Sequence, residues 1–233
     1  MTELSRTRPD LQRRAVARLV ALGLALGAGA AWPQPGNAGA PLVEAAQRGD
    51  LARVRALLDA GIPIGQRDAR GRTAVLAATD GNHLPVVRLL IARGADVNAQ
   101  DDQRDSAFLL AGARGHAAIV RATLDAGADL ASTNRYGGTA LIPACHYGHV
   151  ETVRLLLQTR IDVDHVNKLG WTALLEAVIL GDGGPAHAEI VRLLIAAGAA
   201  LNLADRDGVT PLQHALRRGQ AQVAAMLQAA GAR

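Results

Sequence analysis

The residues best suited to chemistry in this sequence are one cysteine and two histidines within five positions. Cys145 is the only cysteine of the chain, His146 follows it directly, and His149 comes three residues later. A thiolate beside an imidazole is the arrangement of an activated nucleophile, and Cys and His together are also common metal ligands. The same residues can equally be packing groups of a helix. The elements that hold them decide between these interpretations.

Those elements belong to a repeat that extends through most of the chain. A short apolar tetrapeptide that opens with a small or hydroxyl residue recurs at spacings of 33, 33, 33, 33 and 38 residues. A glycine, or in one unit an asparagine, stands nine residues after each opening. Six such units fill residues 36–233, and they open at Ala40, Thr73, Ser106, Thr139, Thr172 and Thr210.

Each unit predicts a pair of helices with a polar turn before it. The opening Thr or Ser is suited to cap a short apolar helix, and the glycine nine residues later ends it. A second apolar-periodic helix follows, as in HVETVRLLLQT, and most units then carry a glycine suited to a left-handed C-cap. The composition agrees, because 49% of the residues are apolar and only 2% are aromatic.

The chain resembles ankyrin repeats. The segments that carry the resemblance are TPLQHA (Thr210–Ala215), GRTAVLAA (Gly71–Ala78), GHVETVRLLL (Gly148–Leu157) and RGADVNAQD (Arg93–Asp101). It implies an all-α solenoid of stacked helix-turn-helix units with β-turn fingers, whose neighbours bury one continuous core. The family's preferred histidine in the opening tetrapeptide is replaced by Val43, Leu76, Leu109, Ile142, Leu175 and Gln213. We therefore expect apolar packing at that place.

The register of the repeat favours a structural role for the cysteine and histidines. His149 stands where other units have His83, His116 and, after an insertion, His187. The resemblance implies that this histidine forms a structural hydrogen bond. Cys145 stands where other units have mostly small or apolar residues, so we expect it to pack inside a helix. We predict no metal and no cofactor.

Other catalytic patterns are missing from the sequence. GxSxG, HExxH and P-loop motifs do not occur, and the glycine-rich segment GDGGPAH lacks the Lys and Ser/Thr of a phosphate-binding loop. Ser106 opens a unit, which favours a helix cap over a nucleophile. No carboxylates are paired as acid and base. We therefore expect that the protein is not an enzyme.

The first 31 residues have the layout of a secretory signal peptide. Five arginines precede an apolar run of 13 residues (Leu19–Ala31), which is shorter than the ~20 residues of a membrane span. We expect cleavage within residues 30–38 and a periplasmic location. Arg13-Arg14 leaves the twin-arginine route open, and an uncleaved amphipathic anchor is the alternative.

The charge of the rest of the chain argues against nucleic acid as a partner. The formal net charge is +4, but the remaining residues hold 20 basic and 19 acidic side chains once residues 1–31 are set aside. A surface for a polyanion requires clustered basic charge. We expect no nucleic acid, no membrane contact after removal of the leader, and a monomer.

Departures from the repeat predict a binding surface in the fourth and fifth units. By the resemblance, finger tips and the solvent side of the first helices form a concave surface. The two tyrosines and one of the two tryptophans fall on it, and exposed aromatic residues of this kind mark binding hot spots. The expected residues are Arg135, Tyr136, His146, Tyr147, Lys168, Leu169, Trp171, Glu176, Ile179 and Leu180. The alternative is that the rings only stiffen the stack.

The inserted residues Asp182–Ala186 are expected as a longer loop beside this surface. They either contact a partner or are a neutral addition. We predict a non-catalytic protein-binding module that uses the concave surface of units two to five. One alternative is a small-ligand or peptide receptor, or a stress-protective factor acting with an oxidative-stress enzyme such as catalase, as resemblance to exported bacterial ankyrin proteins suggests. A host-directed effector is a third.

Overall fold

The computed structural model describes residues 39–233 of the chain. The expected signal peptide, its cleavage region and Trp32 lie outside these residues. Within them, no helix is both long enough and apolar enough to cross a membrane.

The described residues form six consecutive helix pairs, one for each repeat unit. Between residues 39 and 233 there is no β-strand, only an isolated antiparallel bridge between Arg67 and Thr73. The fold is therefore all-α, as the sequence predicts. The helices are α2 (Pro41–Gln47), α3 (Leu51–Asp59), α4 (Ala74–Asp80), α5 (Leu84–Ala92), α6 (Ala107–Arg114), α7 (Ala117–Asp125), α8 (Leu141–His146), α9 (Val150–Leu156), α10 (Ala173–Ile179), α11 (Pro185–Ala196), α12 (Pro211–Arg217) and α13 (Ala221–Ala229).

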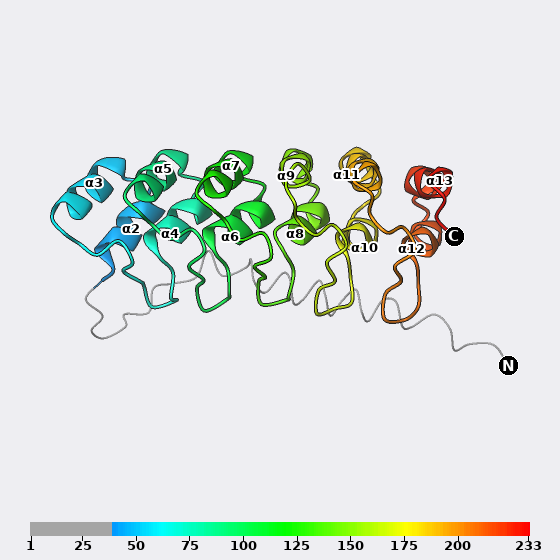
Figure 1. Cartoon of the computed structure of the whole chain (residues 1–233), viewed down its shortest axis with the longest axis horizontal. Coiled ribbons are helices and arrows are strands. Elements are labelled where there is room, and N and C mark those ends of the chain that lie inside the picture. The colour runs from blue at the N-terminus through cyan, green and yellow to red at the C-terminus, as the bar shows by residue number, and fades with distance from the viewer. Residues whose placement is uncertain (1–38) are drawn as a thin grey trace. The chain divides into compact units, whose positions relative to one another are not determined.

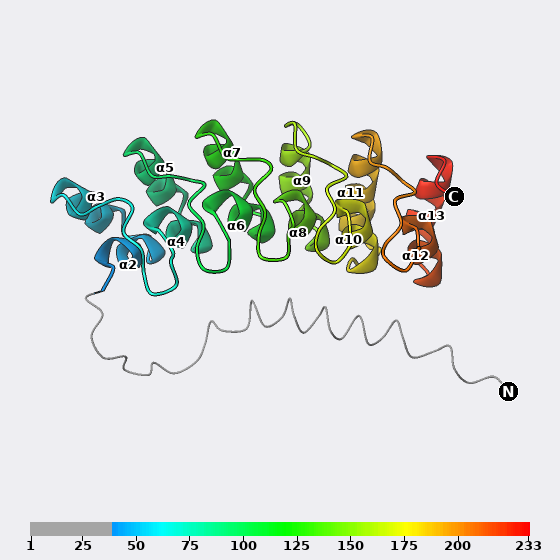
Figure 2. The same cartoon turned by 60° about the horizontal axis from the view of Figure 1, so that its bottom comes forward.

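The helix pairs stack side by side in two rows (Figure 1). The first helices of the units, α2, α4, α6, α8, α10 and α12, form one row, and the second helices form the other. Each helix contacts its pair partner and the equivalent helices of the neighbouring units. The turns that join one unit to the next project away from the helices as fingers, which Figure 2 shows from a second direction. This arrangement is the predicted solenoid of short-range contacts.

One apolar core runs through the stack between the two rows. Its members are almost all Ala, Val, Leu and Ile, and Phe108 is the largest side chain that is fully buried. The prediction for the fourth residue of the opening tetrapeptide is confirmed in units one to five, because Val43, Leu76, Leu109, Ile142 and Leu175 are buried. Gln213, at the same place in the last unit, is exposed. A polar residue there suits the end of the stack, where no further unit covers it.

The opening residues cap their helices in three of the six units. The side-chain oxygens of Ser106, Thr172 and Thr210 accept hydrogen bonds from the backbone N–H three residues later. Ser106 is thus a helix cap, as expected. Thr73 and Thr139 form no such bond, although both are buried. The capping prediction is wrong for these two units.

The fingers share one turn geometry, in which an Asp or Asn side chain accepts two backbone hydrogen bonds. Asn167 Oδ1, for example, accepts from the N–H groups of Leu169 and Trp171. The turn also needs a left-handed residue, which is Gly170 in this finger. The other turn acceptors are Asp68, Asp101, Asn134 and Asp205. A short polar side chain followed by a left-handed residue therefore sets the direction of every finger.

The insertion in the fifth unit lengthens a helix, which differs from the loop that we expected. Pro185 begins α11, so the last two inserted residues are helical and α11 has 12 residues where the other second helices have seven to nine. Proline is favoured at the first position of a helix, because its missing N–H is not needed there. Only residues 182–184 remain as a short bend. The structure thus leaves little loop to close over a partner.

Candidate functional site

Cys145 is a packing residue of α8. Its side chain is fully buried in the apolar core, and burial raises the pKa of its thiol well above the usual value. A thiol in this environment is neither a ready nucleophile nor a ready metal ligand. Over residues 39–233, no three His, Cys, Asp or Glu side chains are grouped so that they could hold a metal ion. The expectation that Cys145 is packed inside a helix is confirmed.

The repeated histidines connect neighbouring units through backbone carbonyl groups. The Nε2 atom of His149 lies 3.2 Å from the carbonyl oxygen of Ala113 in the preceding unit. His83 and His187 form the same bond, to the carbonyl groups of Gln47 and His146 at 3.0 and 2.9 Å. The predicted structural role is therefore confirmed for these three histidines.

The predicted binding residues belong to the fingers and first helices of units four and five or directly follow these helices, but they differ in exposure. We call the side of these two units that is formed by the finger tips and the solvent side of the first helices the finger face. Tyr147 and Lys168 are exposed there, and Arg135, Tyr136, His146, Leu169 and Leu180 are half-buried. Trp171, Glu176 and Ile179 are only 9%, 6% and 8% exposed.

The expectation that Trp171, Glu176 and Ile179 are exposed is therefore wrong. Trp171 precedes the opening Thr172, where the finger folds back against the helices, and its backbone N–H is bound by Asn167 Oδ1. The burial of Trp171 agrees better with the alternative interpretation, in which its ring stiffens the stack, than with a role as an exposed contact residue. The remaining seven residues are accessible to a partner to differing degrees.

Contacts between neighbouring fingers hold Arg135, Tyr136 and Lys168 in place. The guanidinium of Arg135 lies 4.7 Å from the centre of the Tyr136 ring and donates a hydrogen bond of 2.9 Å to its hydroxyl oxygen. It also bonds Gln103 of the preceding finger. Lys168 donates from its backbone N–H to the carbonyl of Tyr136 and from Nζ to that of Arg135, at 2.9 and 3.0 Å. These side chains are therefore ordered before any partner binds.

Tyr147 presents an aromatic ring to solvent beside this group. It is 37% exposed, and its ring stacks on that of His146 with centroids 4.1 Å apart and an angle of 14°. The ring of His149 is tilted by 34° relative to that of Tyr147, with centroids 6.0 Å apart. Tyr147 thus combines exposure with a fixed orientation.

Glu176, His146 and Asn167 form a polar group whose contacts the sequence did not predict, although Glu176 and His146 are among the expected binding residues. Glu176 Oε1 accepts a hydrogen bond of 2.9 Å from Asn167 Nδ2, and Oε2 lies 3.6 Å from His146 Nδ1. Burial raises the pKa of Glu176 to about 8 and lowers that of His146 to about 4. Both groups are then neutral at pH 7, so their contact is not an ion pair.

A second carboxyl group with a raised pKa, that of Asp105, lies in the third unit. Burial, and secondarily the charge of Asp101, raise the pKa of Asp105 to about 6, although Arg135 and Arg114 oppose the shift. The only sequence signal for these groups was their place beside the helix openings. Their burial could not be predicted from it.

Comparison with known proteins agrees with this architecture. A family model described as ankyrin repeats (3 copies) matches residues 16–101, 108–183 and 161–233, which is most of the chain. The chain belongs to the ankyrin-repeat family. The fingers and the outer row of second helices lie on opposite sides of the stack (Figure 1).

Several ankyrin-repeat proteins are similar to this chain. The crystal structure of an ankyrin repeat domain from Acinetobacter baumannii AYE is 53% identical, with a TM-score of 0.80, and the match covers 83% of this chain and 98% of that one. The ankyrin repeat domain of Bcl-3, described as a unique member of the IkappaB protein family, is 30% identical with a TM-score of 0.75, covering 85% and 89%.

A shorter match connects the chain to a curated protein. The putative ankyrin repeat protein YahD of Escherichia coli (strain K12) is 47% identical over 57 residues, which are 24% of this chain and 28% of that protein. The match therefore spans less than a third of either chain, and it supports the repeat family alone.

Proposed function

We propose that this ankyrin-repeat protein is a non-catalytic binding module that holds a partner protein on the finger face of units four and five. Ankyrin repeats are generally protein–protein interaction modules. The observation that carries the proposal is Tyr147, an exposed ring fixed by stacking on His146. Ordered aromatic residues beside arginine are typical of binding hot spots, and their order reduces the entropy that association costs.

The accessible residues around Tyr147 have distinct tasks in this proposal. Arg135 and Lys168 supply positive charge at the edge, and Leu169 and Leu180 supply apolar surface. Buried Trp171, Glu176 and Ile179 support these residues from beneath. Because Glu176 and His146 are neutral at pH 7, the floor of the finger face does not repel an apolar side chain.

Affinity capture with a matched pair of variants tests the proposal. Tagged full-length protein, Tyr147→Ala/Lys168→Ala and Leu216→Ala would be compared in extracts of a bacterium that expresses the chain. Leu216 is 56% exposed and lies in α12 of the last unit, outside units four and five, so its variant controls for loss of an exposed apolar residue. A partner kept by the wild type and by Leu216→Ala, but lost by the double variant, supports the proposal. Equal retention by all three would place the interface elsewhere.

We also propose that the module acts in the periplasm. The proposal depends on the leader-like composition of residues 1–31. Intact-mass measurement of the protein in a periplasmic fraction would test it, and the expected mass is that of a chain beginning within residues 31–39. A full-length mass in the cytoplasmic fraction alone would contradict it.

The small-ligand alternative gains no support from the elements that it needed. A small-ligand site in this region would need a closed pocket near Trp171 and the insertion. Trp171 is buried, and part of the insertion has become the first turn of α11. We therefore favour a protein partner.

A further inference from the structure

Arginine recurs on the outer row of helices at the spacing of the repeat. The second helices of the first five units each carry one arginine in the same register, 33 or 38 residues apart. They are Arg55 in α3, Arg88 in α5, Arg121 in α7, Arg154 in α9 and Arg192 in α11. This row lies on the opposite side of the helix pairs from the fingers (Figure 1).

In units four and five these arginines are neutralised. Arg154 and Arg192 both bind Glu189 Oε1, at 3.0 and 2.7 Å, and Glu151 lies 3.7 Å from Arg154. Each glutamate stands three residues before the arginine of its own helix. The outer side of these two units is therefore a closed network of charges.

In units one to three the acidic partners are replaced while the arginines remain. Ala52, Pro85 and Ala118 stand where units four and five have Glu151 and Glu189. Within the described chain, Arg55, Arg88 and Arg121 are exposed and form no ion pair with a carboxylate within 4.0 Å. We call these three residues the open arginine row.

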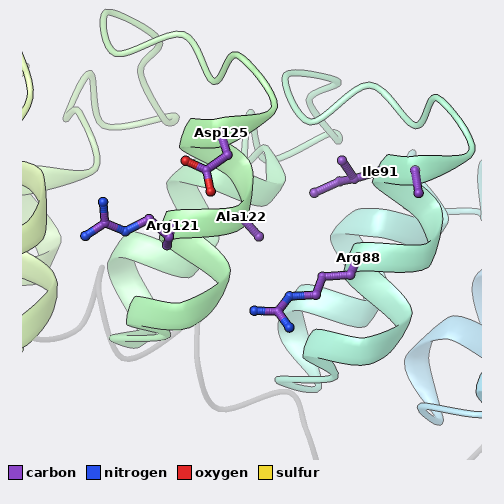
Figure 3. A pocket seen from close by; sticks show the side chains of 6 residues that line it. Arg88, Ile91, Arg121, Ala122 and Asp125 are labelled. Atoms are coloured by element: carbon purple, nitrogen blue, oxygen red, sulfur yellow. The ribbon is translucent and has the colours of Figure 1, made fainter.

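A groove with an apolar floor lies between the helices that carry two of these arginines. It has a volume of about 250 Å³ and separates α5 from α7. Figure 3 shows that Arg88 extends from α5 toward α7, into this space. Arg121 extends from α7 in the same direction along the stack, and therefore away from α5. The floor is apolar, and the residues that line the groove are Arg88, Ile91, Ala92, Arg121, Ala122 and Asp125.

We propose that the open arginine row binds an acidic segment of a partner protein in an extended conformation. Neighbouring packed helices lie about 8–10 Å apart, and three residues of an extended chain span about 10 Å. Carboxylates at every third position of such a segment therefore match successive arginines and supply the charges that units one to three lack. An apolar side chain between two carboxylates fits over Ile91 and Ala122. Carboxylate–guanidinium pairs of this kind are strong and directional.

Acidic groups on the same side favour a protein segment over a continuous polyanion. Asp125 lines the groove, and Asp59 at the end of the preceding second helix, α3, binds Arg93 at 2.9 Å. A nucleic acid with a phosphate at every step would meet these carboxylates, whereas a peptide can place neutral residues opposite them. This surface is separate from the finger face, and the inference does not depend on the proposed function.

Fluorescence anisotropy with a designed peptide tests the inference. The probe is fluorescein-labelled Asp-Val-Thr-Asp-Val-Thr-Asp, and the control peptide, Asp-Asp-Asp-Val-Thr-Val-Thr, has the same composition with its charges grouped. Full-length protein would be titrated at about 50 mM salt, where screening is weak. We expect Arg88→Gln/Arg121→Gln to raise the Kd for the probe roughly tenfold. The matched variant Arg154→Gln/Arg192→Gln should change it less than about twofold, because those arginines are already paired.

Four results would overturn the inference. Equal weakening by the two double variants would show that net charge, and not the open arginine row, attracts the probe. Equal affinity for the two peptides would remove the spacing argument, and absence of binding up to about 1 mM would remove the site. A single-stranded oligonucleotide that displaces the peptide at lower concentration would assign the row to a polyanion instead. Arg88, Arg121 and Arg192 are exposed and Arg154 is half-buried, so each double variant should change thermal unfolding only slightly.

Discussion

The carboxyl group of Glu176 lies 3.6 Å from the imidazole Nδ1 of His146, yet neither group is charged at pH 7. Burial disfavours the charged form of both, which raises the pKa of the acid and lowers that of the base. Asn167 donates a hydrogen bond to the other carboxyl oxygen. The finger face of units four and five therefore rests on a neutral polar group, and this group links stability to pH.

The pKa of Glu176 predicts that stability falls as the pH rises above 6.5. The pKa of Glu176 is raised from 4.5 to about 8, so between these pH values the folded state holds a proton that the unfolded state has released. The resulting stabilisation is lost progressively as the pH rises from 4.5 to 8. The pKa of His146 is lowered from 6.5 to about 4, and burial also lowers the pKa values of His116 and His149; these histidines act in the opposite sense, mainly below pH 7. The pKa of Asp105 is raised to about 6, so this group also titrates mainly below pH 6.5. We expect the free energy of unfolding in urea to drop by about 2 kcal/mol between pH 6.5 and 8.

Glu176→Gln is the control for this pH dependence. The variant keeps an oxygen that can accept the hydrogen bond from Asn167, but it cannot ionise. Its free energy of unfolding should stay level between pH 6.5 and 8, and at pH 8 it should exceed that of the wild type. An identical decline in both proteins would assign the pH dependence to another group.

Truncation of Trp171 should destabilise the protein much more than truncation of Tyr147. Trp171 is buried, so Trp171→Ala leaves a cavity and should lower the free energy of unfolding by about 3 kcal/mol or more. Tyr147→Ala removes an exposed ring and should cost less than about 1 kcal/mol. Urea unfolding at pH 6.5 measures both. If Tyr147→Ala were the more destabilising, Tyr147 would be part of the core and unsuitable as the centre of an interface.

The contrast between Trp171 and Tyr147 also marks the limit of sequence reasoning here. The repeat period predicted the helix pairs, the core and the role of His149, because each depends on contacts that recur in every unit. The burial of Trp171 depends on how one finger folds onto its own helix, and the period carries no information on that. The neutral state of Glu176 depends likewise on its own burial, which the period does not predict.

The open arginine row and the helical start of the insertion are two features that the sequence analysis did not predict. The arginines recur at the repeat spacing, so the sequence held a signal for them; their lack of ion pairs became visible only with coordinates. Pro185 was a signal for a helix start within the insertion. Whether the preceding residues form a loop or a bend depends on the position of His187, which is bound to Asp182 and to the carbonyl of His146.

Arg104 predicts a site where the protein can be stabilised. It has φ of 60° at the place where the other fingers have Gly71, Gly137, Gly170 and Gly208. A left-handed conformation costs a residue with a side chain about 1–2 kcal/mol, and glycine avoids this cost at some loss of unfolded-state entropy. We expect Arg104→Gly to raise the free energy of unfolding by about 0.5–1 kcal/mol.

Asn82→Gly is the comparison for Arg104→Gly. Asn82 is also left-handed, with φ of 55°, but asparagine tolerates this conformation better than arginine does. Its replacement should therefore yield the smaller gain in thermal and urea unfolding. A larger gain at Asn82 would show that backbone strain does not govern the turn at Arg104.

Gln220 should stabilise the contact between the last two units in place of the repeated histidine. It stands one residue after the glycine of its unit, is buried, and donates from Nε2 to the carbonyl groups of Val178 and Gly181 at 3.0 and 3.2 Å. Gln220→Ala leaves these buried acceptors without the side-chain donor and should lower the free energy of unfolding by about 1–3 kcal/mol. Gln222→Ala, an exposed glutamine two residues later on α13, should change it by less than about 0.5 kcal/mol. Equal values for the two variants would mean that helix packing alone, without this hydrogen bond, holds the last unit to the stack.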